Sequence, residues 1–315
     1  MSEPDVLVLR QTIHGSDAAD LVASLRERLP GREVVLARTP AEERDLIETA
    51  RVAVGLDIDE ELLAAAEELE LFACVFAGTG HLPRDALADR GVAVTNASGV
   101  HGPNIAEYVV GSMIAHARQW PRARRQQADR EWRTYETTEV YGSTVAVVGL
   151  GAIGRAIVDR LESFDAETIG VRYSPEKGGP TDEVYGFDRF HEAVADAEYV
   201  ALACPLTETT RGLVDADALK TMRDDAVLIN IARGPIVDTD ALVASLRNSR
   251  IRGAALDVTD PEPLPEDHPL WGLGNVTITP HNAGHTPHYY DRVADILAEN
   301  IGRLDTGEEL ENRVA

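Results

Sequence analysis

Lysine and cysteine are both scarce in this chain, and a long apolar run is lacking. Lys177 and Lys220 are the only lysines among 315 residues, and Cys74 and Cys204 are the only cysteines. Both cysteines lie in apolar, strand-like runs, so we expect reduced, buried thiols rather than a disulfide or a metal site. No apolar run approaches the ~20 residues of a membrane span. The acidic N-terminus does not resemble a signal peptide, so we expect a cytoplasmic protein without a membrane partner.

The charge is strongly one-sided. Aspartate and glutamate number 54 against 30 lysines and arginines, which gives a formal net charge of −24. Self-repulsion of this size destabilises a compact state unless salt screens it. Acid excess with almost no lysine favours a halophilic protein made for a salt-rich cytoplasm; the alternative is an ordinary acidic protein from a GC-rich genome. In either case a nucleic acid is excluded as the expected partner.

The hydrophobic pattern alternates between short apolar runs and amphipathic segments, which predicts βα units and mainly parallel sheets. The predicted fold is α/β, with two Rossmann-like, doubly wound parallel-sheet domains and a cleft between them. In the first part we expect strands at 6–9, 34–37, 51–56, 71–76 and 92–95, with helices at 17–29 (Asp17 a candidate cap), 41–50 and 60–69. In the second part we expect about six strands, at 145–148, 168–171, 199–204, 226–231, 254–258 and 276–279, with helices at 152–161, 188–195, 215–222 and 238–247. Further helices are expected at 104–119 and 286–304, and the Arg-rich stretch 118–133 is interpreted as a connection, solvated or in a subunit contact.

A glycine fingerprint marks the start of the second part. The strand Val145–Val148 is followed at once by Gly149, Gly151 and Gly154, at G-x-G-x-x-G spacing, and then by an amphipathic segment. Strand, turn and helix in this order are the context that dinucleotide binding requires. The first glycine permits a tight turn, the second lets amides approach a pyrophosphate, and the third lets the helix pack closely on the strand. The turn Gly149-Leu150-Gly151-Ala152-Ile153-Gly154 is therefore a predicted cofactor site; a purely structural turn is the alternative.

The residue after the next strand indicates which dinucleotide binds. NAD-binding units place an acidic residue there, about 20 positions beyond the glycines, on the ribose 2′-hydroxyl. This chain has Arg172, followed by Tyr173 and Ser174 and then by Lys177. A guanidinium suits the 2′-phosphate of NADP. We therefore predict that NADP is preferred and that NAD remains possible, with Arg172 as a plain surface residue the alternative.

Three polar residues follow predicted strands of the second part. Arg233, Glu262 and His281 all stand where the carboxyl ends of parallel strands meet. Arg233 can hold the carboxylate of a 2-oxoacid or polarise its carbonyl. His281 can donate a proton, while Glu262 orients the imidazole ring and favours its protonated form. Taken singly, Arg233 can be a surface cation and Glu262 one more acidic residue, and His285 and His288 lie close enough to His281 in the sequence to be mistaken for it. His14, His116 and His191 are interpreted as surface or packing residues.

A glycine-rich loop stands at the end of a strand of the first part. Ala77-Gly78-Thr79-Gly80 follows the apolar run 71–76, and the backbone N–H groups of such a loop can bind a carboxylate. A simple turn is the alternative.

At these residues the chain resembles the D-isomer-specific 2-hydroxyacid dehydrogenases of the glyoxylate/hydroxypyruvate reductase and D-lactate dehydrogenase type. The resemblance is carried by the glycine fingerprint, Cys204-Pro-Leu-Thr-Glu-Thr-Thr210, Asn230-Ile-Ala-Arg-Gly-Pro-Ile-Val-Asp238, Ala255-Leu-Asp-Val258 with Glu262-Pro263, and Thr279-Pro-His-Asn-Ala-Gly284. It implies that Arg233, Glu262 and His281 are catalytic, and that Ala77, Gly78 and Thr79 bind the substrate carboxylate together with Arg233 and His281. It also implies a cofactor site that includes Cys204, Pro205, Thr210, Ile231, Ala232, Asp257 (on the nicotinamide carboxamide), His281 and Gly284.

The resemblance further implies a substrate domain of residues 1–98 plus 285–315, a dinucleotide-binding domain of residues 99–284, and a homodimer to which the helix at 104–119 contributes. The implied activity is reduction of 2-oxoacids to D-2-hydroxyacids. Two alternatives are a dinucleotide-sensing, corepressor-like binding protein and a dehydrogenase of the same scaffold that uses another hydride donor, such as phosphite. The substrate side chain stays open, since Trp271, Tyr108 and Tyr289 can line the pocket or belong to a core or interface. His81 leaves the polarity of that pocket open as well.

Overall fold

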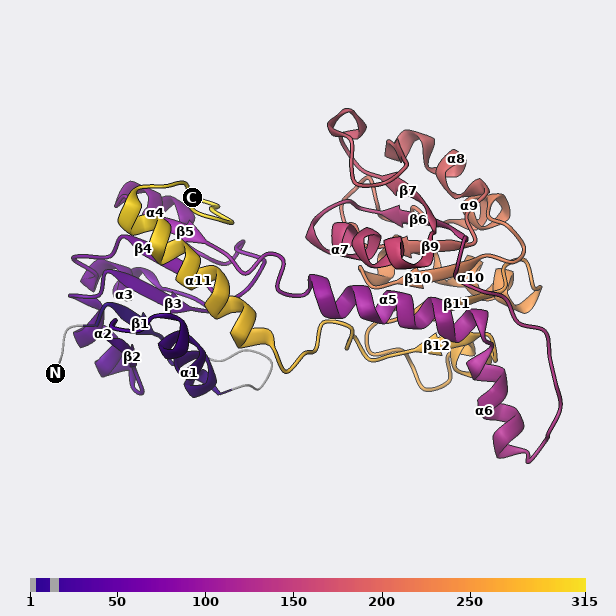
Figure 1. Cartoon of the computed structure of the whole chain (residues 1–315), viewed down its shortest axis with the longest axis horizontal. Coiled ribbons are helices and arrows are strands. Elements are labelled where there is room, and N and C mark those ends of the chain that lie inside the picture. The colour runs from indigo at the N-terminus through magenta and orange to yellow at the C-terminus, as the bar shows by residue number, and fades with distance from the viewer. Residues whose placement is uncertain (1–3, 12–16) are drawn as a thin grey trace. The chain divides into compact units, whose positions relative to one another are not determined.

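A computed structural model describes residues 4–11 and 17–315. The chain divides into two compact units, Met1–Val100 with Thr286–Ala315, and His101–His285. Each unit contains one parallel sheet with a hydrophobic cluster on either face, so both are α/β in architecture (Figure 1). His14 lies outside the described residues. Among the helices that are described, none has the length and apolar character needed to cross a bilayer.

The first unit has a five-stranded sheet in the order β2-β1-β3-β4-β5. The C-terminal helix α11 returns to this unit and packs beside α1 (Figure 1). Asp17 caps α1 by accepting a hydrogen bond from the N–H of Ala19, as expected. The strands are β1 Val6–Val8, β2 Val34–Leu36, β3 Val52–Gly55, β4 Leu71–Cys74 and β5 Ala93–Thr95, and the helices are α1 Ala18–Arg28, α2 Pro40–Ile47, α3 Glu60–Ala65, α4 Arg84–Asp89 and α11 Tyr289–Thr306.

The second unit has a seven-stranded sheet in the order β12-β11-β10-β9-β6-β7-β8. Every strand pair is parallel, and the order reverses between β6 and β9. The long helix α5 packs along α7 (Figure 1). The strands are β6 Thr144–Val148, β7 Glu167–Val171, β8 Glu183–Tyr185, β9 Tyr199–Leu202, β10 Val227–Asn230, β11 Gly253–Leu256 and β12 Val276–Ile278, and the α-helices are α5 Gly102–Ala117, α6 Trp120–Ala128, α7 Ala152–Leu161, α8 Phe190–Ala195, α9 Ala216–Thr221 and α10 Thr239–Arg247.

Three elements differ from the sequence prediction. The second sheet has seven strands rather than six, because the short edge strand β8 was not predicted; Glu183 is exposed and gives it no apolar signal. The interpretation of 118–133 as a connection is wrong for its first half, since α6 occupies Trp120–Ala128. Gln126 is the one residue of α6 that is fully buried, so the helix lacks the apolar stripe that periodicity detects. The six-residue helix α4 was also missed.

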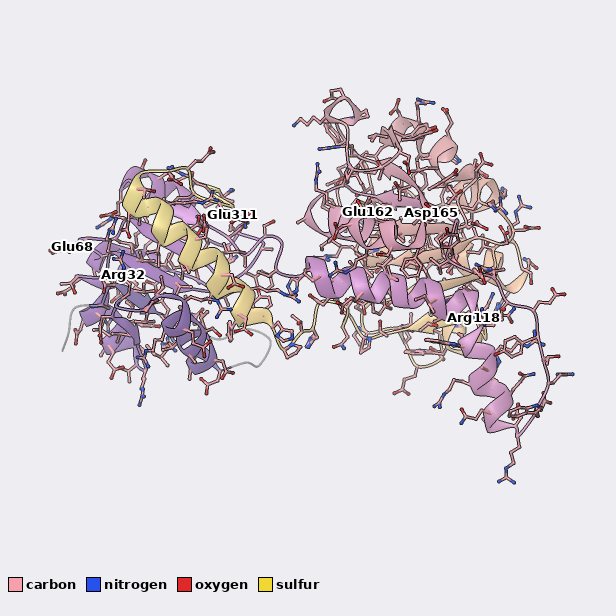
Figure 2. The ribbon with its side chains drawn as sticks, viewed as in Figure 1. Arg32, Glu68, Arg118, Glu162, Asp165 and Glu311 are labelled. Atoms are coloured by element: carbon pink, nitrogen blue, oxygen red, sulfur yellow. The ribbon has the colours of Figure 1, made fainter. Side chains whose placement is uncertain are left out.

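The surface and the interior divide as the composition predicts. The labelled carboxylates Glu68, Glu162, Asp165 and Glu311 are exposed (Figure 2). Both cysteines are buried. Burial raises the pKa of the Cys74 thiol and raises that of Cys204 to about 11, so both are protonated at neutral pH and poor nucleophiles.

Candidate functional site

The glycine turn between β6 and α7 has the close contacts that the fingerprint predicts. Gly149 has a φ of 102°, and a Cβ there would stand 2.7 Å from backbone atoms of Cys204. A Cβ on Gly154 would stand 1.9 Å from the carbonyl oxygen of Gly149. A Cβ on Gly151 would meet nothing within 4 Å. Two of the glycines are therefore required by packing, whereas the side of the turn at Gly151 is open.

This turn lies at the switch point of the sheet. The strand order reverses between β6 and β9, and ligands of open α/β sheets bind outside the carboxyl ends of the strands at such a reversal. Helix α7 begins here at Ala152, and no side chain caps its first turn. The unpaired N–H groups of a helix N-terminus favour an anion such as a pyrophosphate.

Arg172 follows β7 directly, at the neighbouring strand end. Its backbone N–H donates to Tyr185 O (3.0 Å), and its guanidinium Nη1 donates to Gly178 O (2.6 Å). The side chain is half-buried, and within the described chain no carboxylate lies within 4.0 Å of its charge. Tyr173 is 82% exposed, Ser174 is half-buried, and Lys177 is exposed in a 3₁₀ turn, Pro175–Lys177. The segment thus presents cationic groups without an internal counter-ion.

The segments after β9 and β10 complete the edge beside the glycine turn. Cys204 is buried and Pro205 is exposed. Thr210 is 2% exposed, and its hydroxyl donates to Pro205 O (2.6 Å), so it shapes this loop from within. Ile231 and Ala232, which follow β10, are also buried.

Arg233 lies at the end of β10, in a turn that is fixed by two hydrogen bonds of a side chain. Asn230 is 1% exposed; its side chain accepts from Ala232 N–H (3.0 Å) and donates to Arg233 O (3.1 Å). A Cβ on Gly234 would lie 1.9 Å from Thr259 O. Glycine therefore lets the loop after β10 touch the loop after β11. The Arg233 side chain itself is exposed, as binding of a small anion requires.

Glu262 and His281 form a hydrogen-bonded pair. His281 Nδ1 lies 3.1 Å from Glu262 Oε2, and the other carboxylate oxygen accepts from the N–H of Thr259 (3.0 Å). An ionised carboxylate can only accept, so Nδ1 carries the proton and Nε2 is the nitrogen left for a ligand. The two side chains are 51% and 40% exposed. His281 has a φ of 52°, a left-handed conformation that is rare outside glycine and that the surrounding contacts must hold in place.

Asp257 anchors the loop that carries His281. It is 3% exposed, and its carboxylate accepts from the hydroxyl of Thr279 (2.5 Å) and from the N–H groups of Asn282 (2.8 Å) and Ala283 (2.9 Å). Its carbonyl oxygen accepts from His281 N–H (2.8 Å). Because the Thr279 proton goes to Asp257, Tyr108 on α5 donates to Thr279 Oγ1 (2.8 Å). A buried carboxylate thus fixes the loop on both sides of His281.

Replacing Thr279 with valine tests this network. The change keeps the shape of the side chain but removes one hydrogen-bond acceptor of Tyr108 and one donor to the buried carboxylate of Asp257. A buried polar group left unsatisfied costs about 1–3 kcal/mol. We expect the free energy of unfolding, measured in urea, to fall by about that amount in Thr279→Val and much less in Thr279→Ser, which keeps the hydroxyl. Equal stability of the two variants would show that the network contributes nothing.

In the first unit, the loop after β4 exposes backbone donors. Ala77 and Gly78 are exposed, and a Cβ on Gly78 would meet nothing within 4 Å. Within the described residues, the N–H groups of Ala77, Gly78 and Thr79 have no hydrogen-bond acceptor. His81, just beyond, donates from Nε2 to Leu56 O (2.8 Å). This hydrogen bond ties the loop to the segment after β3. Three unpaired amides in succession can bind a carboxylate.

The remaining candidates from the sequence have separate places. Tyr289 is 6% exposed and donates to Val75 O (2.6 Å), so it belongs to the core of the first unit. Trp271 is 52% exposed, with its indole N–H on Pro265 O. His116 is buried, and His191 is exposed with Nδ1 2.9 Å from Thr221 Oγ1. Gly284 lies against His101.

Sequence reasoning did not find the supporting residues. Asn230, Gly234 and Thr279 were part of recognised motifs, but no role was predicted for them, and Asn104, which donates to Ala283 O (2.8 Å), was not singled out at all. For Asn230, Gly234 and Thr279 the available signal was a position beside a predicted strand end, whereas Asn104 lies in the first turn of α5 and had no such signal.

Two parallel-sheet α/β units, one with a glycine turn at its switch point, are the architecture of dinucleotide-binding proteins. The family model described as "D-isomer specific 2-hydroxyacid dehydrogenase, NAD binding domain" matches residues 110–283. The chain belongs to this family of oxidoreductases, which act on 2-oxoacids and 2-hydroxyacids, and it binds NAD(P).

Individual relatives agree with this assignment. The chain is 38% identical over 261 residues to glyoxylate reductase of Thermofilum pendens, covering 80% of this chain and 76% of that protein. It is 33% identical over 288 residues to D-3-phosphoglycerate dehydrogenase of Methanocaldococcus jannaschii, covering 90% of this chain but spanning only 55% of that relative. Among solved structures, the D-isomer specific 2-hydroxyacid dehydrogenase of Xanthobacter autotrophicus in complex with NADPH and MES matches with a TM-score of 0.77 and 30% identity, over 99% of this chain and 98% of the other.

Proposed function

We propose that the chain is an NADP-preferring reductase that converts 2-oxoacids into D-2-hydroxyacids. The hydrogen-bonded pair of His281 and Glu262 carries this proposal, because it places a proton donor on the same sheet edge as the glycine turn. The relative from Thermofilum pendens, a glyoxylate reductase, and the structure from Xanthobacter autotrophicus, solved with NADPH, support it.

The residues of the second unit fit a dinucleotide. A Cβ on Gly149 or on Gly154 would clash with the backbone of the turn or of its neighbour. The turn is open at Gly151, directly before the first residue of α7, which no side chain caps. Arg172 would hold the 2′-phosphate of NADP, with Tyr173 and Ser174 beside it. When bound, the reduced nicotinamide supplies the hydride. The other residues that we assign to the cofactor are Leu150, Ala152, Ile153, Cys204, Pro205, Thr210, Ile231, Ala232, Asp257, His281 and Gly284.

The chemistry of the chain itself is proton donation and charge stabilisation. As the carbonyl carbon is reduced, Nε2 of His281 gives its proton to the carbonyl oxygen, while Glu262 accepts from Nδ1 and balances the imidazolium charge. Arg233 binds the substrate carboxylate and stabilises the developing alkoxide. In the first unit, the free amides of Ala77, Gly78 and Thr79 are the groups that we assign to binding a substrate carboxylate.

We further propose that residues 1–98 with 285–315 form the substrate domain and that residues 99–284 form the dinucleotide-binding domain, whose Arg233 and His281 also contact the substrate. We also propose that the protein is a homodimer to which α5 contributes, and that its acidic surface adapts it to high salt. The formal net charge of −24 supports the second point, since screening by salt reduces the self-repulsion.

Initial rates of NADPH and NADH oxidation test the function. Glyoxylate, hydroxypyruvate, pyruvate and branched 2-oxoacids would be compared in multimolar KCl and in dilute buffer. We expect turnover with at least one oxoacid, faster with NADPH and lost in dilute buffer. Folded protein that turns over no oxoacid with either cofactor would overturn the proposal and favour a dinucleotide-sensing protein.

A further inference from the structure

A cavity of about 790 Å³ lies on the second unit, away from the edge that carries the proposed site. Arg252 and Asn275 line it, and they directly precede β11 and β12. Asp257 and His281 follow the carboxyl ends of the same two strands. The cavity therefore lies at the opposite edge of the sheet, where α5 and α6 meet the end of α10. Arg118, labelled in Figure 2, marks the junction of α5 and α6.

The residues that line this cavity carry more positive than negative charge, whereas the protein as a whole is strongly acidic. Two carboxylates, Asp129 and Glu131, face five arginines, whereas the chain as a whole has 54 acidic and 30 basic residues. Within the described part of the chain, only one of the five arginines lies within 4.0 Å of a carboxylate: Arg133, at 3.3 Å from Glu131. The arginines are Arg122, Arg125, Arg133, Arg247 and Arg252.

Uncharged partners hold three of these guanidinium groups in place. Arg125 donates to Gly274 O (2.5 Å), and Arg252 donates to the hydroxyl of Thr138 (2.8 Å). Arg122 lies 4.9 Å from the ring centre of Tyr135. Such contacts orient a guanidinium without neutralising it, and each guanidinium has five N–H donors. The arginines are thus positioned and still carry free donors.

Buried polar groups of the lining also lack partners. His116 and Gln126 are 6% and 9% exposed, and their Nε2 atoms, together with Arg252 Nε, have no hydrogen-bond partner in the described structure. Buried polar groups are paired in nearly all native structures, so these three atoms are available to a bound polar species. Burial, followed by the charge of Arg252, lowers the pKa of His116 to about 4. The positive charge of the cavity at neutral pH therefore comes from arginine alone.

We propose that this cavity binds a phosphorylated small molecule with at least two anionic groups. Guanidinium groups match phosphate oxygens in bidentate geometry, and several separately anchored arginines require several anionic groups. The volume is that of a small-molecule pocket rather than a single-ion site. The amide of Gln126 can donate to the same ligand.

Calorimetric titration with sodium tripolyphosphate, at constant ionic strength and with saturating NADPH to fill the dinucleotide site, tests this proposal. We expect saturable binding of about one anion per chain. Losing one charge-assisted contact should weaken it about tenfold or more in Arg125→Gln and in Arg122→Gln. Arg160→Gln, on α7, removes the same charge elsewhere in the unit and should bind as the parent protein does.

Three results would overturn the proposal: no saturable uptake, equal weakening in Arg160→Gln, or binding that is seen only without NADPH. Sedimentation of the same samples adds a fourth. A dimer that takes up no tripolyphosphate would also overturn the proposal and would favour a second copy of the chain as the occupant of this face. Thermal unfolding of each variant shows whether it is folded, and Gln126→Leu gives a second, uncharged probe of the same cavity.

Discussion

Replacing His281 with alanine is expected to lower kcat for oxoacid reduction by about a thousandfold, within the range that general acid catalysis contributes. The reason is local: Nδ1 of His281 is engaged by Glu262, so Nε2 is the proton donor at this edge. NADPH binding, measured by fluorescence, should be retained, because His281 is one of many residues assigned to the cofactor, and the glycine turn and Arg172 lie on other strands.

His288→Ala is the matched control. His288 lies seven positions further along the chain and near Asp291 (3.7 Å) rather than on the loop held by Asp257. Its variant should retain the kcat of the parent protein. Substantial activity in His281→Ala with folded protein would remove His281 from the mechanism. A similar loss in both variants would indicate damage to the fold instead of loss of a proton donor.

The fold was largely predictable because its signals are local. The three glycines, the apolar strand before them and the amphipathic helix after them occupy one continuous stretch. The contact of Gly154 with Gly149 is made within this stretch, whereas Gly149 also meets Cys204, after the neighbouring strand β9. The elements that escaped prediction are those with weak apolar patterns. Helix α6 buries one residue completely, Gln126, and strand β8 has three residues at the edge of its sheet.

The candidate site divides in the same way. Arg233, Glu262 and His281 could be placed at strand ends from the sequence alone. Their supporting contacts could not, since Asp257 binds groups 22 to 26 residues away and Tyr108 reaches Thr279 across 171 residues. The contact of Gly234 with Thr259 likewise depends on the order of neighbouring strands. The pattern shows which residues stand at the edge, and the tertiary structure decides which of them meet.

Replacing Arg172 with aspartate is expected to move cofactor preference from NADPH toward NADH. The guanidinium is anchored on Gly178 O and has no carboxylate partner within the described residues, so its charge is available to a 2′-phosphate. Each charge-assisted hydrogen bond contributes about 1.5–3 kcal/mol. The variant loses two such hydrogen bonds to the 2′-phosphate, and the new carboxylate repels that phosphate. The ratio of kcat/KM for NADPH to kcat/KM for NADH should therefore fall by at least about 100-fold. Arg172→Gln should weaken the use of NADPH without improving the use of NADH, because glutamine supplies no carboxylate to accept a hydrogen bond from the ribose hydroxyl.

Net charge has to be separated from local recognition in this experiment. Arg172→Asp makes a protein of charge −24 more negative by two, and a more negative field alone disfavours the more highly charged cofactor. Arg189→Asp makes the same change at an exposed position where the native arginine is paired with Glu192. The long-range part is screened by salt, so in high KCl the Arg189 variant should keep the parent ratio while the Arg172 variant does not. An unchanged ratio in Arg172→Asp would mean that the 2′-phosphate is recognised elsewhere, whereas equal shifts in both variants would reduce the effect to bulk charge.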